Sequence, residues 1–129
     1  MDSESSCPFC ALGESRIRHE TPSFLVIRDG YPVSPGHTLI IRKAHLASVF
    51  ELSPEQFVEL HAAIHWAKAD IEQDFSPDGY NIGINDGPEA GQTVPHLHLH
   101  LIPRYQGDQP DPRGGVRWII PDKAKYWSD

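Results

Sequence analysis

The chain has 129 residues, a net charge of −7 and two cysteines, and these numbers exclude several classes of protein. A length of this order fits one domain with one core, so we expect a single domain over residues 1–129. The acidic balance argues against broad nucleic-acid binding, which requires clustered Lys and Arg. The sequence also lacks a signal segment and any run of roughly 18 apolar residues, which predicts a soluble, cytoplasmic protein without a membrane partner.

The first third of the chain predicts a short tail and two strands. Residues 1–6 are small and acidic and are expected to form a disordered tail. Residues 24–27 read as a buried strand that is closed by the Asp-Gly turn at 29–30. After the proline-rich turn at 32–36, residues 37–41 read as a second strand. We expect these two strands to pair in antiparallel fashion.

A long amphipathic helix is predicted to follow. Ser53 is a suitable N-cap, Pro54 suits the first helical position and Gln56 can close a capping box. Apolar residues then recur in steps of three and four at Phe57, Leu60, Ile64, Ala67, Ile71 and Phe75. This spacing predicts one apolar stripe on a helix of about six turns.

The remainder of the chain predicts two more strands and a tail. In residues 80–85 and 96–102, apolar side chains alternate with polar residues or glycine, which is typical of half-buried strands. Residues 105–129 are expected to form an irregular C-terminal tail, with Trp118 and Trp127 as its attachments to the body or to a dimer partner. Strands dominate and one long helix packs on them, so the fold class is α+β with an antiparallel sheet.

The second of these strands, residues 96–102, carries three histidines. Because side chains alternate along a strand, the leucines face a core while His96, His98 and His100 line the opposite face. Imidazole titrates near pH 6.5, so it serves as nucleophile, acid, base or metal ligand near neutrality. A single metal ion shared by all three histidines is one interpretation. The glycine-rich turn at 87–95 favours another, because its backbone amides suit an oxyanion.

Two segments resemble the histidine triad superfamily of nucleotide hydrolases and transferases. Residues 91–104 read Gly-Gln-Thr-Val-Pro-His-Leu-His-Leu-His-Leu-Ile-Pro-Arg and are similar to the family signature. Residues 29–41 resemble the family's strand, turn and strand with a further active-site histidine. The resemblance is greatest to bacterial proteins assigned to diadenosine tetraphosphate hydrolysis. It implies about five strands, one long and one short helix, and a homodimer whose sheet continues across both subunits.

The resemblance also implies catalytic roles. His98 would be the nucleophile toward the α-phosphate of a nucleotide, with its ring oriented by the main-chain carbonyl of His96. His100 and His37 would donate hydrogen bonds to the nonbridging phosphate oxygens. Thr93 matches the position of a hydroxyl near the leaving group.

Substrate-binding residues are implied in the same way. Asp29 matches a carboxylate that accepts hydrogen bonds from ribose, although Asp-Gly is also a common turn pair. Asn85 stands at a position that binds phosphate or leaving group, where one branch of the family has glutamine. Gln92 would complete the anion pocket, or it would merely support the turn. The family binds the base in an apolar slot, and Phe9, Leu25 and Ile27 are the candidate walls here.

Two cysteines precede the first strand. Cys7 and Cys10 form a C-x-x-C pair, which alone is ambiguous between a redox dithiol and half of a zinc site. Relatives complete such a site with residues that correspond to His45 and His96. The resemblance therefore implies a structural zinc ion, and a reduced dithiol is the alternative.

The expected function is cleavage of the α-phosphate linkage of dinucleoside polyphosphates or related nucleotides, through a nucleotidyl-histidine intermediate. Phosphate in place of water at the second step would make the enzyme a phosphorylase. A nucleotide-binding adaptor with little turnover is the alternative from another class. A divalent metal bound with the substrate phosphates is left open.

Overall fold

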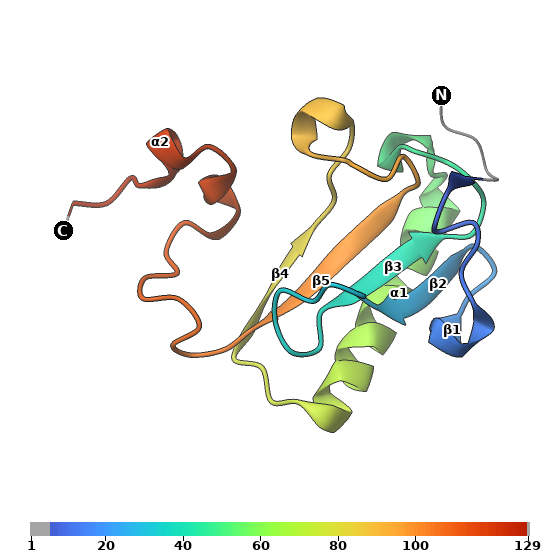
Figure 1. Ribbon diagram of the computed structural model, residues 1–129, viewed down its shortest axis with the longest axis horizontal. Helices are drawn as coiled ribbons and strands as arrows, with labels where there is room; N and C mark the ends of the chain where they lie inside the picture. The colour runs from blue at the N-terminus through green and yellow to red at the C-terminus, as the bar shows by residue number, and fades with distance from the viewer. Residues whose placement is uncertain (1–5, 129) are drawn as a thin grey trace.

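Five short strands form one antiparallel sheet that carries the rest of the protein (Figure 1). The structure, a computed structural model, describes residues 6–128, so most of the predicted N-terminal tail lies outside the described residues. The order across the sheet is β1-β2-β3-β5-β4. The strands and helices are β1 Ile17–Glu20, β2 Phe24–Arg28, β3 Thr38–Arg42, α1 Pro54–Asp74, β4 Gly79–Gly83, β5 His98–Arg104 and α2 Pro121–Ala124.

Helix α1 begins as its sequence predicts. The Ser53 hydroxyl accepts a hydrogen bond from the Gln56 amide, the Gln56 side chain accepts one from the Ser53 amide, and Pro54 occupies the first turn. The buried positions differ in part from the predicted stripe. Phe57 is 46% exposed, and the residues that α1 buries are Leu60, Ala63, Ala67, Asp70 and Ile71.

Asp70 is buried on α1 because it joins the helix to two strands. Its carboxylate accepts hydrogen bonds from Arg18 Nε at 2.6 Å and Arg18 Nη2 at 3.0 Å, and from Arg28 Nη2 at 3.1 Å. These guanidinium groups lower the pKa of Asp70 against the opposing effect of burial, which is the largest single influence. The bidentate geometry ties α1 to β1, and the second arginine ties it to β2.

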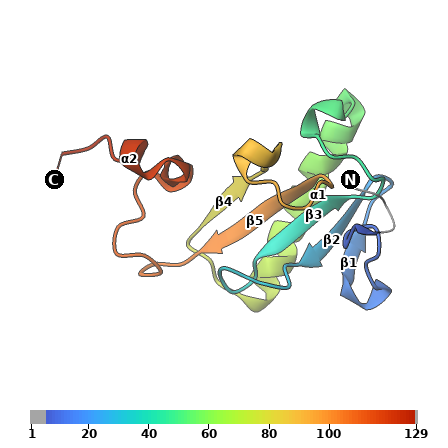
Figure 2. The same cartoon turned by 45° about the horizontal axis from the view of Figure 1, so that its top comes forward.

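The two faces of the sheet pack against different partners. Helix α1 covers one face, where it meets a core that includes Phe24, Ile40 and Leu99 (Figure 2). On the other face Phe9 and Leu12 pack over a smaller cluster, whose buried members are Ile27, Leu39 and Ile41. The N-terminal segment therefore covers part of the sheet face that α1 leaves open.

Strand β5 alternates as predicted. Leu99, Leu101 and Pro103 are buried on the α1 face, while His98 and His100 are partly exposed on the other. The predicted pairing of residues 24–27 with residues 37–41 is also confirmed, since β2 and β3 are antiparallel neighbours. The fold is α+β, as the sequence predicts.

The chain leaves the sheet after β5 as a C-terminal arm, residues 105–128. The arm carries a 3-10 turn at Gly115–Ile119 and then α2, and it lies beyond the β4 edge of the sheet (Figures 1 and 2). No helix in the range 6–128 has the length and apolar character needed to cross a bilayer.

Candidate active site and metal centre

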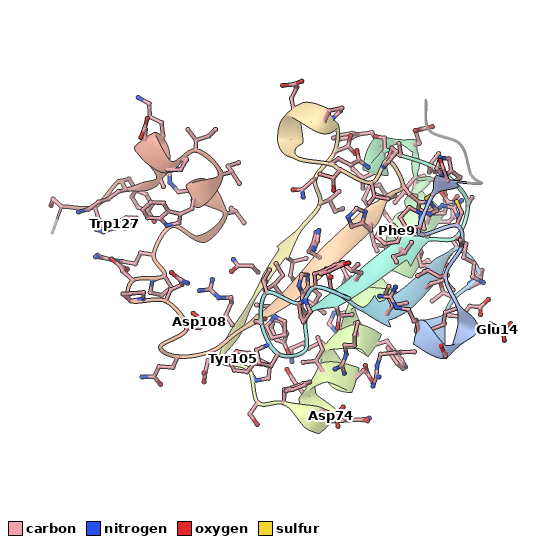
Figure 3. All side chains as sticks on the ribbon, viewed as in Figure 1. Phe9, Glu14, Asp74, Tyr105, Asp108 and Trp127 are labelled. Carbon is pink, nitrogen blue, oxygen red and sulfur yellow. The ribbon has the colours of Figure 1, made fainter. Side chains whose placement is uncertain are left out.

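His98 stands at the start of β5 with one ring nitrogen engaged. Its Nδ1–H donates to the main-chain carbonyl of His96 at 2.8 Å. A neutral imidazole carries a single proton, so this bond leaves Nε2 with its lone pair. The edge of the Phe9 ring meets the His98 ring at a centroid distance of 4.9 Å, and Figure 3 shows Phe9 at the end of the sheet where β5 begins. His98 therefore has the orientation and the free atom that a nucleophile needs.

A chain of hydrogen bonds sets the tautomer of His100. The Val33 amide donates to His37 Nδ1 at 3.2 Å, so the ring proton of neutral His37 is on Nε2. That Nε2–H donates to Nδ1 of His100, and the two nitrogens are 3.0 Å apart. The His100 proton must then be on Nε2. Burial lowers the pKa of both His37 and His100, which favours these neutral forms.

The turn before His37 is shaped by close packing. Gly36 has φ +89°, and a Cβ there would stand 3.0 Å from Phe75 and 3.2 Å from Ile71. The Ser34 hydroxyl donates to the carbonyl of Pro103 at 2.7 Å, which fixes the turn to β5. His37, which follows this turn, is only 3% exposed, and its Nε2 faces His100.

Asp29 lies beside this pair of histidines. Its Oδ1 accepts from the Tyr31 amide at 2.7 Å, as an Asp-Gly turn requires. Its Oδ2 is 3.4 Å from His37 Nε2. The carboxylate therefore has one oxygen that shapes the turn and one that faces the histidines.

The remaining predicted substrate contacts lie on one loop, which joins β4 to β5. Gln92 ties this loop together and to the segment after β3, because its Oε1 accepts from the Gly87 amide at 2.8 Å and its Nε2 donates to the Ala47 carbonyl at 3.0 Å. Gln92 was expected either to complete the anion pocket or to support the turn, and these two bonds correspond to support of the turn. Asn85 and Thr93 are exposed on the loop that joins β4 to β5.

Cys7, Cys10, His45 and His96 converge on one point. Each offers one ligand atom, and these atoms all lie within 4.8 Å of one another. Cys7 Sγ is 3.3 Å from His96 Nδ1, and Cys10 Sγ is 3.2 Å from His45 Nδ1. Ligands at zinc bond lengths of about 2.0–2.3 Å on a tetrahedron stand roughly 3.3–3.8 Å apart, so the donor set and its spacing fit zinc.

The orientation of His96 suits the same ion. Its Nε2–H donates to the main-chain carbonyl of Arg42, which leaves Nδ1 as the unprotonated atom that faces the cysteines. The His96 ring is fully buried, and burial lowers its pKa toward the neutral form that binds a metal. One residue thus presents its ring to the cysteines and its carbonyl to His98.

Sequence reasoning missed two groups that set these tautomers. The Val33 amide and the Arg42 carbonyl belong to the backbone, so the identity of the residue carries no signal for them. Only the fold, which brings each of them to a histidine ring, reveals their part.

Comparisons with known proteins place this geometry in a family. The profile of the HIT domain matches residues 13–107. Protein hit of Bacillus subtilis (strain 168) is 35% identical over 113 residues, which are 84% of this chain and 78% of that protein. The crystal structure of a Zn-bound histidine triad family protein from Mycobacterium smegmatis is similar with a TM-score of 0.70 at 40% identity, covering 84% of this chain and 86% of that one.

A third relative is longer. The asymmetrical bis(5'-nucleosyl)-tetraphosphatase of Schizosaccharomyces pombe is 42% identical over 77 residues, or 60% of this chain, and the match spans 42% of that protein. The family match covers all five strands, helix α1, and the three histidines His96, His98 and His100. The chain therefore belongs to the HIT domain family, the histidine triad proteins.

Proposed function

We propose that the protein hydrolyses the α-phosphate linkage of dinucleoside polyphosphates or related nucleotides through a nucleotidyl-His98 intermediate. The observation that carries this proposal is the 2.8 Å bond from His98 Nδ1–H to the His96 carbonyl, which leaves Nε2 unprotonated beside an open strand face. The name of the Schizosaccharomyces pombe relative supports the same class of substrate.

In the first step His98 Nε2 attacks the α-phosphorus, and the bond from phosphorus to the bridging oxygen breaks. The departing polyphosphate takes the electron pair. The imidazole becomes positively charged, and its Nδ1–H remains bonded to the carbonyl of His96, which stabilises that charge. In the second step water attacks phosphorus and gives up a proton to solvent, while the P–N bond breaks and its electron pair returns to His98 Nε2. This releases a nucleoside monophosphate and regenerates the neutral ring.

His100 is the donor for the negative charge that builds on the nonbridging oxygens. Its Nε2–H is directed by the hydrogen-bond chain from Val33 through His37. A donor that is fixed before the reaction stabilises the transition state more than the ground state. In this proposal His37 is a positioning residue that acts through His100.

The substrate would lie across the open face of the sheet. Asp29 is proposed to accept from the ribose hydroxyls, and Asn85 and Thr93 to contact the leaving group. Phe9 packs against the cluster of Ile27, Leu39 and Ile41, and we propose that this apolar surface beside His98 receives the base.

We also propose that Cys7, Cys10, His45 and His96 hold one structural zinc ion. When bound, the ion supplies a cross-link between the N-terminal segment and the approach to β5. The cross-link would hold Phe9, which lies between the two cysteines, against His98. The spacing of the four donor atoms supports this proposal, and a reduced dithiol is the competing state.

A homodimer through β4 is the proposed assembly. Within the described residues β4 pairs only with β5, so its outer edge offers unpaired backbone groups to a second copy. Ile82 on this strand is 48% exposed. Pairing of two β4 strands would continue the sheet and cover this residue.

The proposed reaction is tested with the His98→Ala variant and a panel of dinucleoside polyphosphates. Loss of the nucleophile should reduce turnover by at least about 10⁴-fold while adenosine monophosphate still binds. Wild-type protein, quenched early with labelled substrate, should carry the nucleotidyl group on His98. Turnover by the variant within tenfold of wild type, or an adduct on His100, would contradict the proposal. Added inorganic phosphate separates a hydrolase from a phosphorylase, which would release a nucleoside diphosphate.

A further inference from the structure

The proposed position of the nucleotide directs its base toward the β1 edge of the sheet. Asp29 follows β2, and its amide donates to the His37 carbonyl at 2.9 Å, so the extended course of the strand continues through it. Its side chain therefore lies on the same face as Ile27. The sheet runs in the order β1-β2-β3-β5 on this side. With the phosphate on β5 and the ribose at Asp29, the base extends over Ile27 toward β1.

Arg16 lies at the rim of this surface. It immediately precedes β1, whose first residue pairs with Ile27 and packs on the same cluster. Arg16 Nη2 donates to the Arg28 carbonyl at 3.1 Å, and a Cβ at Gly30 would stand 3.5 Å from the same nitrogen. The guanidinium therefore lies beside the residues that flank Asp29. This edge of the sheet is the one opposite β4 (Figure 1).

The guanidinium of Arg16 keeps most of its donors for a ligand. An arginine carries five N–H donors, and the bond to the Arg28 carbonyl uses one of them. Within residues 6–128 no carboxylate pairs with Arg16, whereas Arg18, two residues further on, is bound to Asp70. The bond to Arg28 holds the group in place, and the glycine at position 30 has no side chain that would cover it.

A group that only donates hydrogen bonds distinguishes the two purines by one edge of the ring. Guanine presents two acceptors there, O6 and N7, which match the paired donors of a guanidinium. Adenine presents N7 beside an amino group, which is itself a donor. A guanidinium at this edge therefore makes two hydrogen bonds to guanine and leaves the amino group of adenine opposed to its own N–H groups.

We propose that Arg16 determines the base specificity of the half of the substrate that is transferred to His98, and that this half is guanosine in preference to adenosine. The inference rests on the proposed cleavage of dinucleoside polyphosphates and adds the base that the site selects. The apolar surface at Phe9 accepts the ring of either purine. Arg16 reads the edge of that ring, which supplies the discrimination that an apolar surface lacks.

A mixed substrate, adenosine tetraphosphoguanosine, tests the inference by internal competition. Attack of His98 on the guanosine side releases GMP and ATP, and attack on the adenosine side releases AMP and GTP. Wild-type protein should release GMP over AMP by at least about fivefold, the lower end of the discrimination that one bidentate base contact provides. The ratio compares two routes in one protein, so a general loss of activity does not change it.

Three variants identify the source of this ratio. Arg16→Met removes the donors and should bring the ratio of GMP to AMP to about one. Arg16→Lys should also lower it, because an ammonium group cannot span O6 and N7 as a guanidinium does. The control Lys68→Met removes a cation of α1 that pairs with Glu72 at 2.9 Å, and it should keep the wild-type ratio.

A wild-type ratio below about fivefold, or a wild-type ratio that Arg16→Met retains, would overturn the inference. The second case includes equal slowing of both routes, which would indicate a contact with phosphate instead of the base. Failure of the proposed function is recognised separately, because wild-type protein would then release neither mononucleotide. The Kd values of GMP and AMP decide the inference in that case. A preference for GMP that Arg16→Met abolishes supports it, and equal values overturn it.

Discussion

Replacement of His37 by leucine tests how the active site orients its proton donor. Leucine removes the Nε2–H that lies 3.0 Å from His100 Nδ1, so His100 is free to move its own proton to Nδ1. The ring would then present a lone pair to the anionic phosphate instead of a donor. A hydrogen bond to a charged group contributes about 1.5–3 kcal/mol, which corresponds to roughly 10- to 150-fold in kcat.

The assay is steady-state hydrolysis of diadenosine tetraphosphate, with three matched variants. His37→Gln should recover part of the lost rate, because its amide can donate to the same nitrogen of His100. In a His100→Ala background the change to leucine should add almost nothing, since its effect passes through His100. A rate loss below threefold in His37→Leu, or losses that multiply in the double variant, would refute the hydrogen-bond chain.

Three further predictions concern stability and metal content. Asp70→Asn should lower the free energy of unfolding by about 2–3 kcal/mol in urea melts. This loss is smaller than the loss expected for a fully buried ion pair, because the arginine partners of Asp70 keep some solvent contact. Asp74→Asn, at an exposed carboxylate, should change it by less than about 0.5 kcal/mol, and equal effects would contradict this. Burial lowers the pKa of His37 and His100, so below about pH 6.5 the unfolded chain binds more protons than the folded protein. The free energy of unfolding should therefore fall as the pH drops from about 7 toward 5. The fall is at most about 1.4 kcal/mol per pH unit for each histidine. His37→Leu should make that fall shallower, and an unchanged slope would exclude this residue as a source. Purified protein should contain about one zinc per chain, and Cys7→Ser should lose it; zinc retained without the cysteines would instead indicate an ion shared by the histidines of β5.

Local patterns were sufficient for the elements that carry strong periodicity. The alternation of β5 predicted which side chains it buries, and the capping residues predicted where α1 begins. The predicted apolar stripe of α1 agrees less well with the residues that the helix buries. Ala63 is small and Asp70 is charged, so neither gave an apolar signal, and both are buried because of their partners on the strands.

Other features depend on contacts that are distant in the sequence. Strand β1 has four residues, of which three are charged or histidine, and it forms because β2 offers an edge. One of the two bonds that assign Gln92 to loop support involves Ala47, which is far away along the chain. Gly115 of the arm approaches Asn81 of β4, and no local pattern predicts that contact.

The acceptor for His98 is a main-chain oxygen, and this has a consequence for how position 96 tolerates replacement. Every amino acid supplies such an oxygen, so the side chain at this position is not selected by the orientation of the nucleophile. In the proposed zinc site, the imidazole of His96 is instead needed as a ligand beside the two thiols, which lie 3.3 and 3.4 Å from its Nδ1. A family member without those cysteines could carry a different residue at the equivalent point and retain the same chemistry on phosphorus.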